Sequence, residues 1–312
     1  MSPSVGKARG VLRNAAAAGA FAHARVAPDD GLRDFVEHFW MVRWDLRGHT
    51  PQLQETLPHP NVHIVFERDK TRIFGVHTAR FSKLLEGEGV AFGVKFRPGG
   101  FYPFLQRPLS SIADGSIALQ DVFGDDAGML ENEVLTNTDV AGMIAVTTRF
   151  LQVHAPPTDP NVDRIAAIVA RIVDDRSLTN VDDLARRNGL SKRSLQRLFK
   201  QYVGVSPKWV INRYRLHDAV ELLASGETID GPRLALELGY FDQAHFIRDF
   251  KKLIGRSPTD YRRVAASAKS GSCGEKSFLR RPDIEQRAQA DARIPGDTEQ
   301  PETQARERTP PQ

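Results

Sequence analysis

Cysteine is nearly absent from this sequence, and its scarcity excludes two kinds of cross-link. Cys273 is the one cysteine among 312 residues. No disulfide can form within the chain, and no zinc site can be built on several cysteines. A chain without disulfides suits a reducing compartment, so we expect a cytoplasmic protein.

Long apolar runs are missing as well. No stretch approaches the ~18 consecutive apolar residues that a membrane-spanning helix needs, so we expect no membrane partner. The first twenty residues carry Lys7, Arg9 and Arg13 and lack the bulky apolar segment of a signal peptide. We predict that residues 1–20 form a disordered tail.

Positive charge is concentrated in one block of the chain. Residues 21–150 carry 13 Lys and Arg against 17 Asp and Glu, whereas residues 161–267 carry 19 against 13. A net positive block of this kind is where a polyanion would bind.

Composition also predicts the domain boundaries. Residues 155–160 contain Pro156, Pro157 and Pro160, cannot continue a helix and are typical of a linker. Residues 265–312 contain few large apolar side chains and are predicted to be disordered. The remaining segments are a domain at 21–154 and a second domain at 161–264.

The two domains differ in pattern, which predicts an α+β fold for the first and an all-α fold for the second. Residues 62–66 and 90–96 are rich in β-branched and aromatic side chains, as strands are. Residues 35–44 fit a strand or a helix equally well. Helices are expected near 128–135 and 138–153. The first domain is therefore mostly β, with a barrel as one form it could take.

An internal repeat is the strongest signal in the second domain. The first copy is matched fifty residues later, and one inserted residue then shifts the offset to 51. The matching pairs are Leu184 and Leu234, Ala185 and Ala235, Gly189 and Gly239, Leu195 and Phe246, Arg197 and Arg248, Phe199 and Phe250, Lys200 and Lys251, Gly204 and Gly255, Ser206 and Ser257, and Pro207 and Pro258.

Each copy has the pattern of two helices separated by a turn. In the first copy Asn180 is placed to cap a short helix, Gly189 to make a turn with positive φ, and Ser191 to cap a second helix. In the second copy Gly239 and Asp242 take the corresponding places. A helix of about 18 residues, spanning roughly 27 Å, joins the copies.

The second helix of each copy is a candidate for reading DNA. Arginine and lysine can bond guanine or neutralise phosphates, and glutamine can bond adenine. A basic helix face is by itself usually just solvated, but two such faces in matching copies favour a DNA-binding function. The candidate contacts are Lys192, Arg193, Gln196, Arg197, Lys200, Gln243, His245, Arg248 and Lys251.

Residues 178–263 resemble the AraC/XylS family of bacterial transcription regulators. The residues that carry the resemblance are the runs 190–200, 204–207, 235–240, 242–246 and 255–258, together with Arg213, Arg215, Leu216, Ala219, Leu222, Leu223, Phe250, Lys251, Tyr261 and Arg262. The resemblance implies that helices 192–202 and 243–253 enter successive major grooves of double-stranded DNA. It also implies contact with RNA polymerase, activation as the family tendency, and a sensing or dimerising domain before the DNA reader.

The second copy departs from the family pattern. Gly231 and Pro232 stand where family members usually have an apolar residue early in the short helix. The second reading face also carries less charge, because Ala244 and Ile247 cannot donate to bases. We therefore expect the first helix to dominate specificity.

The first domain offers two weaker hypotheses about a ligand. His59, His63 and His77 could suggest a metal, but His59 and His63 would be roughly 13 Å apart on an extended strand, so we predict no metal or other cofactor. Arg97, next to Pro98 and two glycines, could meet an anionic ligand or pair with a carboxylate. The segments 57–63 and 93–101 resemble those of AraC-type regulators with an uncharacterised N-terminal class. A small-molecule effector and a homodimer are expectations from the family alone.

The sequence disfavours three alternatives to transcription regulation. A DNA-repair alkyl acceptor needs a reactive cysteine in a metal-bound cluster, whereas Cys273 lies in the predicted tail. No nucleophile motif or phosphate loop indicates an enzyme in the first domain. A nucleoid protein would bind DNA without sequence preference, which the Gln and Arg reading faces disfavour. We predict a regulator and not an enzyme.

Overall fold

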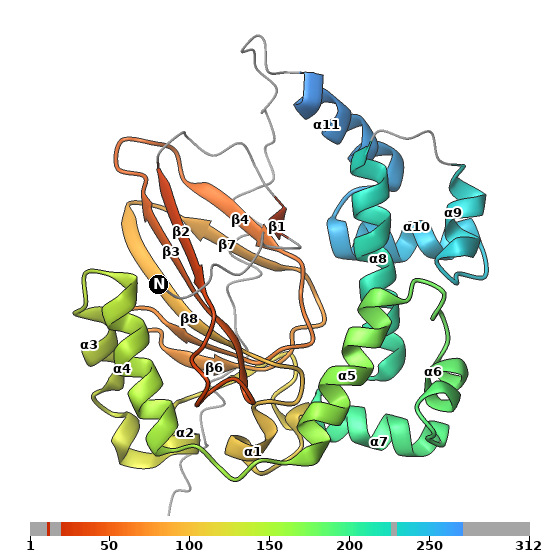
Figure 1. Cartoon of the computed structure of the whole chain (residues 1–312). Helices are drawn as coiled ribbons and strands as arrows, with labels where there is room; N and C mark the ends of the chain where they lie inside the picture. Colours follow the sequence, from red (N-terminus) through yellow and green to blue (C-terminus); the bar gives the residue numbers. More distant parts are fainter. Residues whose placement is uncertain (1–10, 13–19, 226–229, 271–312) are drawn as a thin grey trace, which may run out of the picture. The chain divides into compact units, whose positions relative to one another are not determined.

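The computed structural model describes residues 11–12, 20–225 and 230–270 (Figure 1). Residues 271–312 of the predicted C-terminal tail, which include Cys273, lie outside the described residues. The described residues form a β-rich N-terminal region and a helical C-terminal region. None of the described helices is long and apolar enough to span a membrane.

The N-terminal region contains two antiparallel sheets. The larger has the strand order β2-β3-β8-β5-β6-β9 and the smaller the order β1-β4-β7. The strands are β1 (Val11–Leu12), β2 (Phe21–Val26), β3 (Val36–Asp45), β4 (Gln52–Thr56), β5 (His63–Phe66), β6 (Arg72–Phe74), β7 (Phe81–Leu85), β8 (Glu88–Phe96) and β9 (Ser116–Ile117). Among these strands β2 and β9 are edges of the larger sheet, so the barrel considered from the sequence is not closed.

Helices cover one face of the larger sheet. This face carries Phe39, Phe92 and Phe96, which share a buried apolar core with Val134 of α3 and Met143 of α4 (Figure 1). The helices of this region are α1 (Tyr102–Leu105), α2 (Gln120–Phe123), α3 (Leu130–Leu135) and α4 (Val140–Val153), with short 3₁₀ turns at Leu109–Ser111 and Gly124–Ala127. The helices expected near 128–135 and 138–153 and the strands expected at 62–66 and 90–96 are confirmed, and residues 35–44 prove to be a strand.

In the described part of the C-terminal region, every regular element is a helix. Its helices are α5 (Pro160–Asp174), α6 (Val181–Arg187), α7 (Lys192–Tyr202), α8 (Pro207–Ser225), α9 (Gly231–Glu237), α10 (Gln243–Ile254) and α11 (Pro258–Ser270). Two apolar cores lie along α8. One holds residues of α5, α6 and α7, and the other holds residues of α9 and α10. Val76 of the N-terminal region belongs to the first core and Leu57 to the second.

Three segments differ from the expected boundaries. Val11 and Leu12, inside the predicted tail at 1–20, pair with β4, because strand pairing depends on a partner that local composition does not reveal. Pro160, assigned to the linker, begins α5, where its missing N–H costs no helix bond. Helix α11 continues through residues 265–270, which were predicted to be disordered.

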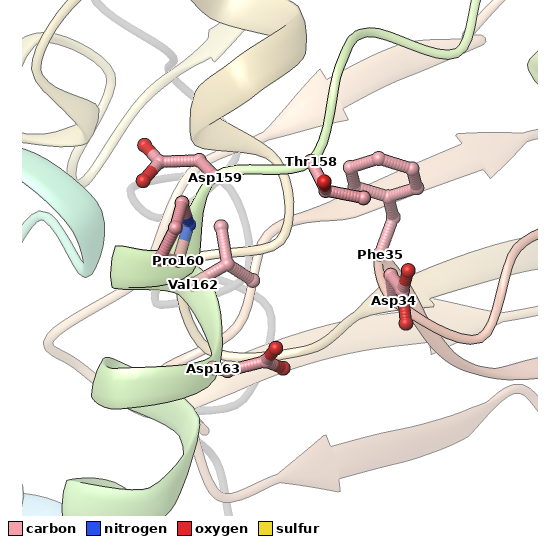
Figure 2. A pocket seen from close by; sticks show the side chains of 7 residues that line it. All are labelled: Asp34, Phe35, Thr158, Asp159, Pro160, Val162 and Asp163. Atoms are coloured by element: carbon pink, nitrogen blue, oxygen red, sulfur yellow. The ribbon is translucent and has the colours of Figure 1, made fainter.

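The segment before α5 lies against the N-terminal region. Thr158, Asp159 and Pro160 line a small cavity of about 160 Å³ together with Asp34 and Phe35 (Figure 2). Asp159 caps α5 by accepting from the N–H of Asn161 at 2.9 Å, and it also accepts from the Tyr202 hydroxyl at 2.5 Å. Hydrogen bonds therefore tie the start of α5 to α7.

Candidate nucleic-acid interface

The first helix pair, α6 and α7, forms as its sequence predicts. The Asn180 side chain accepts from the N–H of Asp183 at 2.8 Å, and Ser191 Oγ accepts from the N–H of Ser194 at 3.1 Å. Gly189 lies between the helices with a φ of 63°, a conformation that favours glycine. Both predicted caps and the predicted turn are confirmed.

Helix α7 has one buried and one exposed face. Leu195, Phe199 and Tyr202 are buried in the core that α7 shares with α5. The five side chains predicted to meet DNA are all exposed on the other face: Lys192, Arg193, Gln196, Arg197 and Lys200. Lys192 also forms an ion pair with Asp182 at 3.0 Å.

The arginines of α6 and α7 differ in whether they pair with an acidic side chain. The Asp183 carboxylate accepts hydrogen bonds from Arg187 and Arg186, which lower the pKa of its carboxyl group. In contrast, no carboxylate of the described residues lies within 4 Å of the guanidinium group of Arg193 or of Arg197. Their guanidinium groups are therefore available to an external anion.

The second helix pair, α9 and α10, repeats this geometry. Gly239 has a φ of 77°, and the carboxylate of Asp242 accepts from the N–H of His245 at 2.7 Å. The buried face of α10 includes Phe246, Phe250 and Leu253. Pro232 lies in the first turn of α9, so the unusual Gly231 and Pro232 do begin a helix.

The exposed side of α10 holds the remaining candidates. Gln243, Arg248 and Lys251 are exposed. His245 is only half exposed, lies 3.5 Å from Asp249 and packs edge-on against the Tyr240 ring at 5.1 Å between centroids. Internal contacts therefore hold His245 in place, as the ion pair with Asp182 holds Lys192.

Sequence reasoning missed an exposed aromatic side chain beside this face. Phe241 is 90% exposed and immediately precedes the cap of α10. Leu236 of α9 is also exposed. An aromatic residue in the turn before a helix cap was a signal that could have identified this position.

The residues considered for a ligand in the N-terminal region have separate neighbours. The His59 ring packs against His217, the His63 ring against Trp40, and the His77 ring against Phe74. In the described part of the chain, no group of three or more His, Cys, Asp or Glu side chains is placed to hold a metal ion. Arg97 pairs with Asp163 of α5 at 3.1 Å, which is the carboxylate alternative.

A second set of polar residues was also missed. Glu37, Asn61 and Lys95 meet at the end of strands β3 and β8, where Lys95 is 8% exposed. A lysine inside the otherwise apolar run 90–96 was the signal in the sequence.

Two family models match the chain. Residues 24–118 match a domain of unknown function (DUF6597), and residues 184–264 match a helix-turn-helix domain. The second match covers α7, α8, α9 and α10 completely, together with most of α6. The helical region therefore contains a helix-turn-helix DNA-binding domain.

Several curated regulators are similar to this chain. Regulatory protein SoxS of Salmonella typhimurium is 37% identical over 87 residues, which are 27% of this chain and 77% of SoxS. Transcriptional activator RhrA of Rhizobium meliloti is 31% identical over 177 residues, 53% of this chain and 54% of RhrA. An uncharacterised regulator of Haemophilus influenzae is 31% identical over 31% of this chain and 32% of its own length. The chain spans about a third to a half of the first relatives it matches.

Solved structures are similar over the same part of the chain. A probable AraC family transcriptional regulator from Rhodopseudomonas palustris is 27% identical over 31% of this chain and 93% of that chain, with a TM-score of 0.29. The SoxS match, which covers more than two thirds of that protein, places this chain by sequence in the AraC family of transcriptional regulators.

Proposed function

We propose that the protein binds DNA sequence-specifically, with α7 and α10 as two recognition helices in successive major grooves. The observation that carries the proposal is the matching pair of exposed faces, one with Arg193, Gln196 and Arg197 and the other with Gln243 and Arg248. Each face belongs to a helix that begins with a side-chain cap and follows a turn at a glycine. Arginine and glutamine are the side chains that form paired bonds with guanine and adenine.

The length of the connecting helix supports two adjacent contacts. Helix α8 has 19 residues, so it spans roughly 28 Å at about 1.5 Å per residue. Major grooves on one face of DNA recur every ~34 Å. A connecting helix of this length is of the order of one DNA turn, which supports the proposal that the two helix pairs meet one face of the duplex.

Lysines on these faces would supply attraction without sequence preference. Lys200 and Lys251 are exposed at the later turns of α7 and α10. Phosphate contacts of this type make binding depend on salt and position the helices on the duplex. Lys192 forms an ion pair with Asp182, so we assign it a phosphate contact and not a base contact.

Selection of binding sites from random DNA by the full protein, at near-physiological salt, tests the proposal. We expect an enriched motif with two half-sites about 10 base pairs apart. Uniform binding to all sequences would instead identify a nucleoid protein and contradict the proposal. R149A, which removes an exposed arginine from α4, is the matched control for loss of charge.

We further propose that the N-terminal region responds to a small-molecule effector and that the protein activates transcription by contact with RNA polymerase. RhrA is named a transcriptional activator, which supports activation as the first hypothesis. Transcription in vitro from a promoter with the selected site should rise with the protein present. A fall in transcript would identify a repressor. A homodimer remains a prediction.

A further inference from the structure

A cavity of about 730 Å³ lies between strands β2, β3 and β8 of the larger sheet on one side and helix α5 on the other. Its sheet side is polar and includes Arg25, Glu37, Asn61 and Lys95. Its helix side combines small apolar residues of α5 with two acids at either end of them. The apolar residues are Ala166, Ala167, Ala170 and Val173, and the acids are Asp163 and Asp174. The cavity is of the size that small-molecule sites usually have.

The polar side is organised around one partly buried ion pair, in which the Lys95 side chain is 11% exposed and the Glu37 side chain 36%. Lys95 Nζ lies 2.8 Å from Glu37 Oε1, and Asn61 Nδ2 donates to Glu37 Oε2 at 3.0 Å. Burial alone raises the pKa of Glu37, but hydrogen bonds from His38 and Lys95 lower it to about 2. Glu37 is therefore ionised at neutral pH.

Burial of the Lys95 ammonium group costs solvation energy, which its partner Glu37 offsets only in part. Lys95 is only 8% exposed, and burial lowers the pKa of its ammonium group. Buried ion pairs often contribute less to stability than apolar residues of similar volume would. A pair held at the wall of a cavity can instead exchange partners with a ligand.

The charges around the cavity are balanced. Arg25, Lys95 and Arg97 face Glu37, Asp163 and Asp174. A ligand with a net charge would leave one charge uncompensated in a partly desolvated site, which is unfavourable. A ligand with one charge of each sign would keep the balance.

We propose that this cavity binds a small zwitterion of the amino-acid class. Its carboxylate pairs with Lys95, its ammonium group pairs with Glu37, and its aliphatic side chain packs on Ala166 and Ala170 of α5. This inference rests on the proposed function, because it identifies the effector as a member of that class.

Helix α5 connects the cavity to the DNA-reading surface. Its residues Ile165 and Ile168 share one buried core with Leu195 and Phe199 of α7. Arg97 at the cavity wall pairs with Asp163 on the same helix. A ligand that packs on α5 would therefore contact the same helix that packs against α7, and could shift the position of α7.

Thermal unfolding of the full protein with each common amino acid tests the inference directly. At about 10 mM, a ligand with a Kd near 1 mM should raise Tm by roughly 2–4 °C. We expect this shift with at least one small aliphatic amino acid, and a saturable signal for it in calorimetry. No shift with any amino acid overturns the inference.

Variants separate the two halves of the site. E37Q and K95M should each weaken binding at least about tenfold. A170F places a large side chain on the helix wall of the cavity, leaves both members of the ion pair unaltered and should also abolish binding. K83M is the matched control, because Lys83 pairs with Glu67 outside the cavity. Equal binding by A170F and the unaltered protein would contradict the assignment, even if E37Q and K95M failed to fold.

Single-charge analogues test the class of ligand. An alkyl carboxylate and an alkylamine with the same carbon skeleton should each bind at least about tenfold more weakly than the amino acid. Equal binding of the carboxylate would overturn the zwitterion assignment. Site selection from random DNA is measured separately, so an enriched DNA motif without amino-acid binding would overturn this inference and leave the proposed function intact. Amino-acid binding without an enriched DNA motif would overturn the proposed function and leave the amino-acid site intact.

Discussion

Arg193 and Arg197 occupy the exposed face of α7 without an acidic partner among the described residues. If each reads a base, R193A and R197A should each cost about 1–3 kcal/mol in binding to the selected site and relax the preference at one position. Quantitative binding to the selected site and to its single-base variants measures both effects.

The alternative for these arginines is a phosphate contact. Such a contact would weaken all sequences alike and lower the salt slope by about one. R149A in α4 should leave both quantities unchanged. Unaltered affinity in both α7 variants would remove α7 from the proposed interface.

Two glycines with positive φ should respond differently to alanine. A Cβ at Gly239 would lie 2.4 Å from the Cβ of Thr179, whereas a Cβ at Gly189 would have no atom within 4 Å. G189A should cost about 1–2 kcal/mol in the free energy of unfolding from backbone strain alone, and G239A should cost more. Urea denaturation measures both values.

Gly48 is the control for this pair. It has a φ of 76° with no atom within 4 Å of an added Cβ, and it lies between β3 and β4. G48A should resemble G189A. A G239A protein no less stable than these two would contradict the close approach of Thr179.

At the scale of elements, capping makes α7 a well-defined helix. Ser191 Oγ accepts from the N–H of Ser194, so S191A should destabilise the protein by about 0.5–2 kcal/mol. S177A is the control, because Ser177 is also exposed and loses a hydrogen bond to Asp175, but caps no helix. An S191A protein whose free energy of unfolding equals that of S177A would contradict a role for the cap.

Local signals account for the elements that the sequence located well. The predicted helix 192–202 has the bounds of α7, and 243–253 ends one residue before α10 does. Caps, glycine turns and apolar spacing all act within a few residues. Strands β4 and β7 were not anticipated, because their stability comes from pairing with each other across 24 intervening residues. For the same reason residues 35–44 could not be assigned until their partner β8 was known.

At the scale of the whole molecule, His63 makes stability depend on pH. Burial, together with the charge of Lys95, lowers the pKa of His63 from 6.5 to about 3. Between those values the unfolded chain binds a proton that the folded chain does not. Stability therefore falls as pH falls through this window, by up to about 1.4 kcal/mol per pH unit from this residue.

The His63→Gln variant isolates this contribution. Denaturation at pH 6.5 and at pH values near 5 should show a smaller loss of stability for H63Q than for the unaltered protein. Glu37 does not titrate in that range, because its pKa is about 2. An identical pH slope for the two proteins would show that His63 is not buried in its neutral form.

Contacts between distant segments were beyond the reach of sequence reasoning. The partner of Arg97 is Asp163, 66 positions along the chain, and Arg213 donates to the carbonyl of Pro58. The exposed DNA-reading candidates were easier to predict, because exposure on one face of a helix follows from apolar spacing on the other. The cavity beside Lys95 depends on strands and a helix that only the folded chain brings together.

In the proposed function, α7 and α10 each read one half of a single DNA site. The most direct test repeats site selection with R197A and with R248A, one variant for each helix. We predict that R197A loses sequence preference in one half-site and R248A in the other, with the spacing between half-sites unchanged. Loss of preference in the same half-site by both variants, or in neither, would contradict the account.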